Sequence, residues 1–181
     1  MNYNLILIIV LIAIIILLRI YFPQIKGALG ENRIKKQLNK LPDNYKTLHD
    51  ITLRSGDKLT QIDHLVIAPY GVFVIETKNY TGWIFGNEKS EYWTQTIYKN
   101  KTRFRNPIKQ NWAHVFSLRE LLSDYDKNLF IPIVVFAGDC KLKNVQAQTE
   151  VVYDENLYNT LSSYHEIKLK PEEVEKIYNN I

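Results

Sequence analysis

The segments Gln-Ile-Asp-His-Leu-Val (residues 61–66) and Val-Phe-Val-Ile-Glu-Thr-Lys (residues 72–78) decide the fold of this chain. Both have the length of a strand and are rich in β-branched residues. Ala-Pro-Tyr-Gly (residues 68–71) lies between them, and proline at its second position predicts a reverse turn. The sequence therefore predicts an antiparallel hairpin in which a few charged side chains interrupt two apolar runs.

The length of the turn determines how the charged side chains meet. Side chains two apart on a strand share a face, so Glu76 and Lys78 point the same way, as do Gln61 and Asp63. With an even number of residues in the turn, Asp63 lies opposite Glu76, and Gln61 opposite Lys78. A three-residue loop with Gly71 as a bulge residue would instead place the two acids on opposite faces. The apolar pattern allows both, and we favour the even register because it gives the charged residues a common role.

Two carboxylates that face each other on a sheet destabilise it unless a positive group lies between them, which suggests a divalent cation. An acid on one strand and Glu-x-Lys on the next resembles the PD-(D/E)xK nuclease superfamily. The two segments, with Asn79, Tyr80 and Gly82, are similar to the nuclease-related domain (NERD) family. Gly30-Glu31 and Asn106-Pro107-x-x-Gln110 also fit that family. The resemblance covers residues 27 to 123 and implies a metal-dependent, nuclease-like fold.

Phosphodiester hydrolysis needs an attacking water and stabilisation of charge on the phosphoryl oxygens. Asp63 and Glu76 would supply ligands to Mg²⁺ or Mn²⁺, with the carbonyl of Thr77 as a third. Lys78 would orient the water or balance the growing negative charge. The alternative is a buried ion pair that holds the hairpin together, although such pairs add little net stability.

Three further residues are candidates for the site. Glu31, Ile34, Leu38 and Leu41 recur at helical spacing, so Glu31 lies on an apolar stripe of a helix over residues 27–41. It is either a third acid near the metal or a carboxylate favoured by the start of the helix. The family resemblance places Gln61 and Gln110 near the site, where amides can bind water or phosphate; each could also be an ordinary satisfied amide.

The N-terminus predicts a membrane anchor over residues 1–26. Residues 5–22 are apolar except for Arg19, and at ~1.5 Å per residue they span roughly 27 Å. We expect Pro23 to end this helix. A cleaved signal peptide is the alternative, but no basic residue precedes the apolar run and no Ala-x-Ala site follows it. Basic residues follow the span and none precedes it, which places the domain in the cytoplasm.

The remaining residues, 27–181, suit one domain. The formal charge is +4, and the single cysteine, Cys140, excludes an internal disulfide and suits a reducing compartment. We expect strands over 45–53, 59–68, 71–78, 92–98, 131–137 and 150–153, with a turn at Ser55-Gly56-Asp57. Helices are expected from Asn106 to Leu122, from Asp154 and after Pro171. This order predicts an α/β fold: a restriction-endonuclease-like core with a mixed sheet of about four to five strands, preceded by one transmembrane helix.

Four cations, Lys99, Lys101, Arg103 and Arg105, alternate along an extended segment that contains no acid. Alternation places them on one side, where they would track phosphates, with Phe104 nearby for stacking. The alternative is a solvated edge strand that uses its charges against association of sheets.

Together these features predict a single-pass membrane protein with a cytoplasmic, Mg²⁺-dependent nuclease domain that acts on DNA or RNA. A non-catalytic nucleic-acid-binding or scaffold module with a nuclease fold is the main alternative, and a membrane-surface protein whose cations contact only lipid is a third. Oligomeric state stays open, although a homodimer would suit a nuclease of this type.

Overall fold

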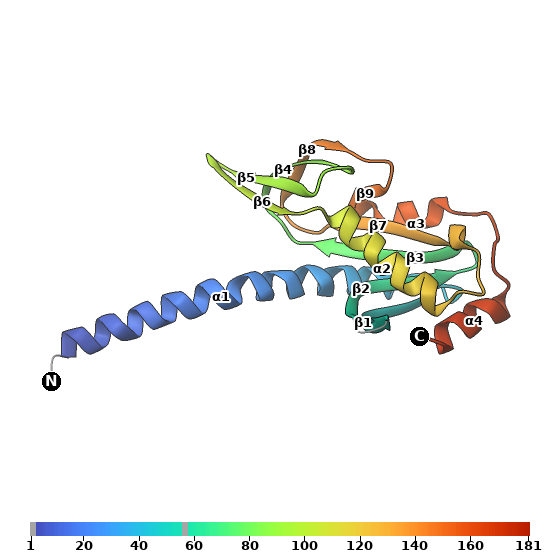
Figure 1. The fold of residues 1–181 in the computed structure, drawn as a ribbon, viewed down its shortest axis with the longest axis horizontal. Coiled ribbons are helices and arrows are strands. Elements are labelled where there is room, and N and C mark those ends of the chain that lie inside the picture. Colours follow the sequence, from blue (N-terminus) through green and yellow to red (C-terminus); the bar gives the residue numbers. More distant parts are fainter. Residues whose placement is uncertain (1–2, 56–57) are drawn as a thin grey trace.

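The computed structural model describes residues 3–55 and 58–181, which form a mixed α/β domain with a long helix projecting from it (Figure 1). The expected turn at Ser55-Gly56-Asp57 falls on Gly56 and Asp57, outside the described residues. Ser55 and Lys58 on either side of it are paired.

The first sheet has five strands in the order β1-β2-β3-β7-β9. Strands β1 (Lys46–Ser55), β2 (Lys58–Ala68) and β3 (Gly71–Lys78) are antiparallel neighbours, whereas β7 (Phe130–Phe136) runs parallel to β3, and β9 (Glu150–Tyr153) parallel to β7. β3 and β7 lie in the middle of the sheet and are almost wholly buried, as expected for continuous apolar runs covered on both faces.

The register of the β2–β3 hairpin is the even one. Ala68 pairs with Gly71 across a two-residue turn, and the last backbone pair of the ladder is His64 with Ile75. The next position along the hairpin therefore sets Asp63 opposite Glu76, as predicted. Beyond this point the ladder between the two strands ends, so Gln61 has no backbone partner on β3 and instead lies opposite Thr52 on β1.

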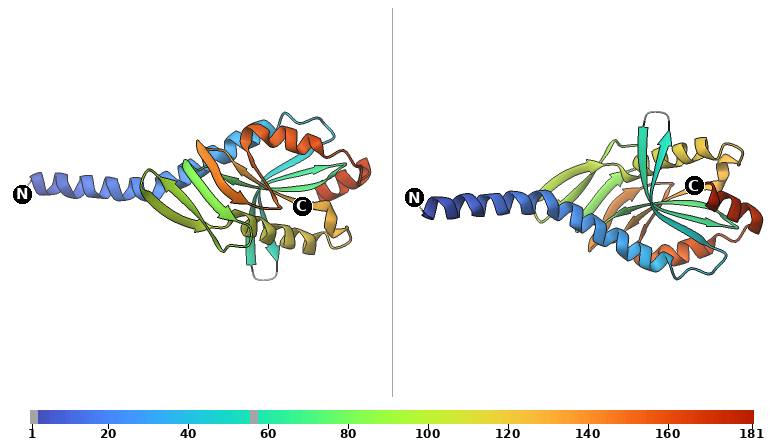
Figure 2. Two further views of the ribbon diagram at one scale, coloured as in Figure 1. Left: turned by 90° about the horizontal axis from the view of Figure 1, so that it is seen from above. Right: turned by 90° about the horizontal axis from the view of Figure 1, so that it is seen from below.

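Helices cover both faces of the first sheet. The C-terminal part of α1 (Tyr3–Leu38) and α3 (Leu157–Ser163) pack on one face, and α2 (Pro107–Leu121) and α4 (Pro171–Asn179) on the other (Figure 2). Short 3-10 turns, η1 (Lys127–Leu129) and η2 (Asp154–Asn156), precede β7 and α3. Adjacent residues of β3 therefore alternate between the two helical layers: Phe73 and Ile75 face α1, and Val72 and Val74 face α2.

A second sheet, with the order β6-β5-β4-β8, was only partly foreseen. Strands β5 (Tyr92–Ile97) and β6 (Asn100–Arg105) match the expected extended segments, but β4 (Gly82–Asn87) and β8 (Cys140–Gln146) were missed. β4 contains two glycines, Gly82 and Gly86, which are uncommon inside strands. Gly86 lets the ring of Trp93 lie directly against the strand, since a Cβ at this position would come within 2.1 Å of that ring. β8 is mostly exposed, and its apolar alternation is interrupted after Leu142, where its register with β4 shifts.

Helix α1 runs without interruption through Pro23, so the prediction that Pro23 ends it is wrong. Proline lacks one N–H and crowds the preceding turn, but the helical residues on both sides carry the helix past this position. Among the described residues, α1 is the one helix long and apolar enough to cross a membrane, with a mean hydropathy of 2.9 in its most apolar window.

The carboxylate of Glu88, directly after β4, ties the end of this strand to the segment between β8 and β9. It accepts hydrogen bonds from the backbone N–H groups of Gln148 and Thr149 and from the Thr149 hydroxyl. Burial raises the pKa of Glu88, but the hydrogen bonds lower it by more than burial raises it. The net pKa of Glu88 therefore lies below the ordinary 4.5. The stability that this carboxylate contributes is therefore present above pH 4.5 and is lost as the pH falls through the lowered pKa.

We expect Glu88→Gln to lower the free energy of unfolding by about 1 kcal/mol at pH 7, because two backbone donors and a hydroxyl lose a charged acceptor. The difference from the unmodified chain should shrink at pH 3. Urea unfolding of the full chain in detergent at both pH values measures it, with exposed Glu155→Gln as the control. An equal loss at pH 7 and pH 3 would contradict the assignment of the effect to the charge.

Candidate active site at the end of strand β3

Asp63 and Thr77 meet where the ladder between β2 and β3 ends. The backbone N–H of Thr77 donates to Asp63 Oδ2 at 2.8 Å, so a side chain replaces the missing strand partner. The N–H and C=O of one strand residue point to the same edge of the strand. The carbonyl of Thr77 is therefore directed to the same side as Asp63, which makes an oxygen-rich corner from one carboxylate and one carbonyl.

Glu76 is the most buried acid of the group, with a side chain 2% exposed. Lys78 Nζ lies 2.6 Å from Glu76 Oε1, and His114 Nε2 lies 3.2 Å from Glu76 Oε2. His114 in turn has its Nδ1 2.7 Å from the hydroxyl of Thr60. With Nε2 protonated, His114 donates to the Glu76 carboxylate and accepts from the Thr60 hydroxyl. Both ring nitrogens of the histidine then have a hydrogen-bond partner.

Helix α2 brings Gln110 and His114 to the site from one of its faces. Asn106 caps the helix through its side-chain oxygen, which accepts from Ile108 N at 2.9 Å, and Pro107 occupies the first turn. Gln110 lies one turn on, where its Oε1 accepts from Lys78 Nζ at 3.1 Å, and His114 follows four residues later. The sequence analysis missed His114, although its four-residue spacing from Gln110 placed it on the same face of the predicted helix.

Glu31 enters the site from the opposite helical layer. Gly30 allows this approach, because a Cβ there would come within 2.6 Å of Asn79 Cβ. Asn79 also donates to the carbonyl of Lys26 at 2.6 Å, which fastens α1 to the end of β3. Of the two alternatives for Glu31, this position favours a carboxylate near the other acids, since the residue lies far inside α1 and not at the start of a helix.

These side chains line one cavity of about 520 Å³ between α1, the end of β3, the N-terminus of α2 and the second sheet. Its lining includes Glu31, Asp63, Glu76, Thr77, Lys78 and Gln110, together with Phe22, Pro23 and Lys26 of α1 and Gln95 and Ile97 of β5. The structure thus gathers five of the six predicted catalytic residues around one space. Gln61 is the exception: it is exposed on β2, because the strand has turned away from β3 at this point.

The electrostatics of the cavity reflect its crowded acids. Burial, followed by the charge of Glu76, raises the pKa of Asp63 to about 7, although the N–H of Thr77 acts in the opposite direction. For Lys78, burial lowers the pKa, but the neighbouring Glu76 carboxylate more than offsets this effect and the net pKa is raised. The ammonium is therefore charged at neutral pH, and the site favours bound positive charge.

The donor set can be compared with the needs of a divalent cation. Within residues 3–55 and 58–181, no group of three or more His, Cys, Asp or Glu side chains is arranged to hold a metal ion. Two carboxylates and a carbonyl nevertheless match Mg²⁺, which commonly binds one or two carboxylates and takes its other ligands from water and phosphate. Repulsion between Asp63 and Glu76 is the observation that favours a cation here.

The four predicted nucleic-acid-binding cations lie away from this cavity. Lys101, Arg103 and Arg105 pair with Thr96, Thr94 and Tyr92, so they share the exposed face of the β5–β6 hairpin, and Lys99 lies in its turn. The cavity is lined from the other face of the hairpin. Phe104 also points to that inner face and packs on Tyr80, with ring centroids 4.6 Å apart. The expectation that Phe104 stacks beside the cations is therefore wrong; Tyr92, under Arg103 at 4.7 Å, occupies that position.

Comparisons with known proteins agree with this arrangement. A family model described as a nuclease-related domain matches residues 26–137, from the part of α1 that reaches the site to the end of β7. The chain is 40% identical over 185 residues to the uncharacterized protein pXO1-01 of Bacillus anthracis, covering 99% of this chain and 86% of the relative. No solved structure matches this chain.

Proposed function

This chain belongs to the nuclease-related domain (NERD) family, within the PD-(D/E)xK-like nucleases, and on that premise we propose that it is a membrane-anchored, Mg²⁺-dependent nuclease. Its substrate would be a phosphodiester of DNA or RNA. The observation that supports this proposal best is the convergence of Asp63, Glu76 and Lys78 on one cavity at the end of β3. A merely structural ion pair would not need a second carboxylate, Asp63, whose pKa is raised by its burial and then by the charge of Glu76.

Each residue of the site has a role in hydrolysis. The Lys78 ammonium, held between Glu76 and Gln110, would orient the attacking water and offset the charge that grows on the phosphoryl oxygens as the P–O bond to the leaving group breaks. His114 would fix the orientation of Glu76 through Oε2. Asp63, Glu76 and the carbonyl of Thr77 would hold Mg²⁺ or Mn²⁺, with Glu31 close enough to bind its waters. The cation would supply charge stabilisation and an activated water.

The test is cleavage of single- and double-stranded DNA and of RNA by the full chain in detergent with millimolar Mg²⁺. Glu76→Gln keeps the shape of the side chain but removes its charge, and we expect cleavage to fall at least about 100-fold. Chelation of the metal should abolish cleavage by the unmodified chain. Glu155→Gln, at an exposed position far from the cavity, is the control and should cleave normally. If Glu76→Gln cleaves as fast as this control, the proposal is wrong.

Membrane anchoring by α1 is part of the same proposal. The large apolar side chains from Ile6 to Phe22 are exposed on all sides of the helix, and nothing in the described domain covers them. A helix that is apolar all round requires an apolar surrounding. The basic residues that follow the span support a cytoplasmic domain.

A non-catalytic nucleic-acid-binding module is the second candidate, and one observation favours it. Both carboxylate oxygens of Glu76 already have protein partners, Lys78 and His114, as in a structural ion-pair network. Binding without cleavage, weakened by salt and lost when Lys99, Lys101, Arg103 and Arg105 are changed to Glu, would support this candidate over the nuclease.

A further inference from the structure

The tip of the β5–β6 hairpin exposes bulky side chains to the surroundings. Ile97 pairs with Asn100, so Tyr98 and Lys99 form a two-residue turn between the strands. Tyr98 is 98% exposed and has a φ of 54°, in the left-handed region that few non-glycine residues adopt. Packing within the domain does not explain an aromatic ring in this position.

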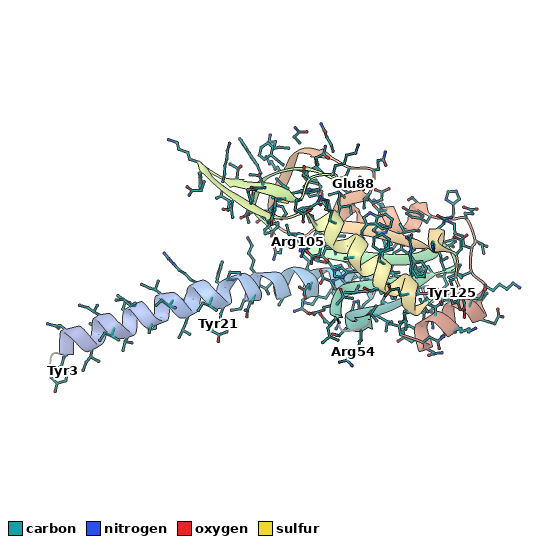
Figure 3. All side chains as sticks on the ribbon, viewed as in Figure 1. Tyr3, Tyr21, Arg54, Glu88, Arg105 and Tyr125 are labelled. Atoms are coloured by element: carbon teal, nitrogen blue, oxygen red, sulfur yellow. The ribbon has the colours of Figure 1, made fainter. Side chains whose placement is uncertain are left out.

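The hairpin and the end of the apolar span of α1 border the same cavity. The cavity of the site is lined by Phe22 and Pro23 from α1 and by Ile97 from the hairpin, so these residues approach the same space from two sides. In Figure 1 the hairpin projects from the domain on the same side as the N-terminal part of α1, although it diverges from that helix; the views of Figure 2 show both pointing the same way. Figure 3 labels Tyr21, and the hairpin tip reaches about as far along the helix as this residue. The tip is therefore level with the end of the apolar span.

The chemistry of the tip suits the boundary between lipid headgroups and acyl chains. Trp83, 48% exposed, lines an apolar hollow of about 590 Å³ together with Ile97 and Tyr98. Cations surround this apolar group: Lys143 lies over the ring of Trp83 at 5.0 Å, and Lys99 adjoins Tyr98. No acidic residue occurs from Tyr92 to Arg105. Exposed tyrosine and tryptophan with neighbouring lysines are the side chains that favour a membrane interface with anionic lipids.

We propose that the tip of the β5–β6 hairpin inserts into the headgroup region of an anionic bilayer and forms a second membrane contact beside α1. This inference rests on the proposed anchoring of the chain by α1. A lone spanning helix would let the domain tilt and rotate above the membrane, whereas two contacts fix its orientation. The cavity that holds Glu76 and Lys78 lies between these two contacts, so it would be held at the membrane surface. Lipid is favoured over nucleic acid at the tip because Ile97, next to Tyr98, lines the same cavity as Phe22 at the end of the apolar span.

The experiment places an environment-sensitive fluorophore on single cysteines of the full chain in nanodiscs that contain phosphatidylglycerol and a headgroup-proximal nitroxide lipid. Tyr98→Cys reports on the tip, Ile12→Cys on the middle of the span, and Tyr158→Cys on the exposed surface of α3. Burial raises the pKa of the native Cys140 thiol to about 11, so it stays protonated and unlabelled at pH 7. The unmodified chain checks this background.

We expect the nitroxide lipid to quench the label at position 98 several-fold more than the label at 158, and quenching at 98 should weaken in nanodiscs of phosphatidylcholine alone. Equal, weak quenching at 98 and 158 while the label at 12 responds to the bilayer would overturn the inference and leave the anchor intact. Absence of a bilayer response at position 12 would reject the anchor itself, and the inference with it. Protection of the label at 98 by an oligonucleotide, without quenching by lipid, would assign the tip to nucleic acid and also overturn the inference.

Discussion

Lys78→Met should reduce Mg²⁺-dependent cleavage by about 10²–10³-fold, because it removes the one ammonium that is placed against Glu76 and Gln110. Methionine keeps the apolar stem of lysine, so the side chain can still fill its place at the end of β3. Rates of cleavage under single-turnover conditions measure the effect on chemistry. Lys109→Met is the matched control: it removes an exposed lysine one residue from Gln110, and it should cleave within about twofold of the unmodified chain.

A stability measurement separates a role in chemistry from a role in folding. Removing Lys78 alone leaves the buried Glu76 carboxylate without the cation that neutralises it and with only the hydrogen bond to His114, so unfolding should become easier. Combining Lys78→Met with Glu76→Gln removes both charges, and we expect the double variant to regain much of that stability while its cleavage stays lost. If cleavage instead returns with stability, Lys78 holds the fold together and does not take part in the reaction.

Asn106→Ala should lower the free energy of unfolding by about 2–4 kcal/mol, the largest loss that we expect from any single polar side chain outside the cavity. The residue is fully buried. Its amide nitrogen contacts the carbonyls of Asn87, Glu88 and Ser90 at 3.2, 2.9 and 2.7 Å, and its oxygen caps α2. Alanine would remove the donor to the carbonyls of Glu88 and Ser90 and the cap of the first helical turn, whereas the carbonyl of Asn87 still accepts from Trp93 Nε1.

The matched control is Asn159→Ala on the exposed side of α3, which should change stability by less than about 0.5 kcal/mol. Asn106→Asp tests the origin of the effect. The carboxylate can still cap the helix, but it replaces a donor with negative charge beside three carbonyls, so this variant should be at least as unstable as alanine at pH 7. If aspartate restores stability, the cap alone accounts for the effect, and the contacts to the β4–β5 turn contribute nothing. Chemical unfolding of each full-length variant in detergent measures the differences.

Much of the fold could be predicted because local patterns agree with the tertiary contacts. β3 was predicted at its observed bounds, since a wholly apolar run between a turn and Glu-x-Lys has few alternatives. Helix α2 was predicted from its cap and its proline. β4 and β8 could not be predicted from their own patterns. The side chains of β4 do not alternate, although one of its partners, β5, is the next strand along the chain, and the alternation that begins in β8 is broken where its register with β4 shifts. The prediction that α1 ends at Pro23 was wrong because the loss of one backbone hydrogen bond does not end a helix whose residues on both sides are helical.

The structure decided the register of the hairpin, which the apolar pattern left open. The sequence by itself determined the family, the hairpin, the apolar first helix and the spacing of Asp63, Glu76 and Lys78. These features depend on neighbours in the chain, through strand alternation, turn length and continuous hydropathy. Only the tertiary structure decided which residues surround Glu76, because His114, Gln110 and Glu31 reach it from two helices on opposite sides of the sheet. The tertiary structure also placed the cations of the β5–β6 hairpin on the face away from the cavity. Which face of a strand is buried depends on what packs against the sheet.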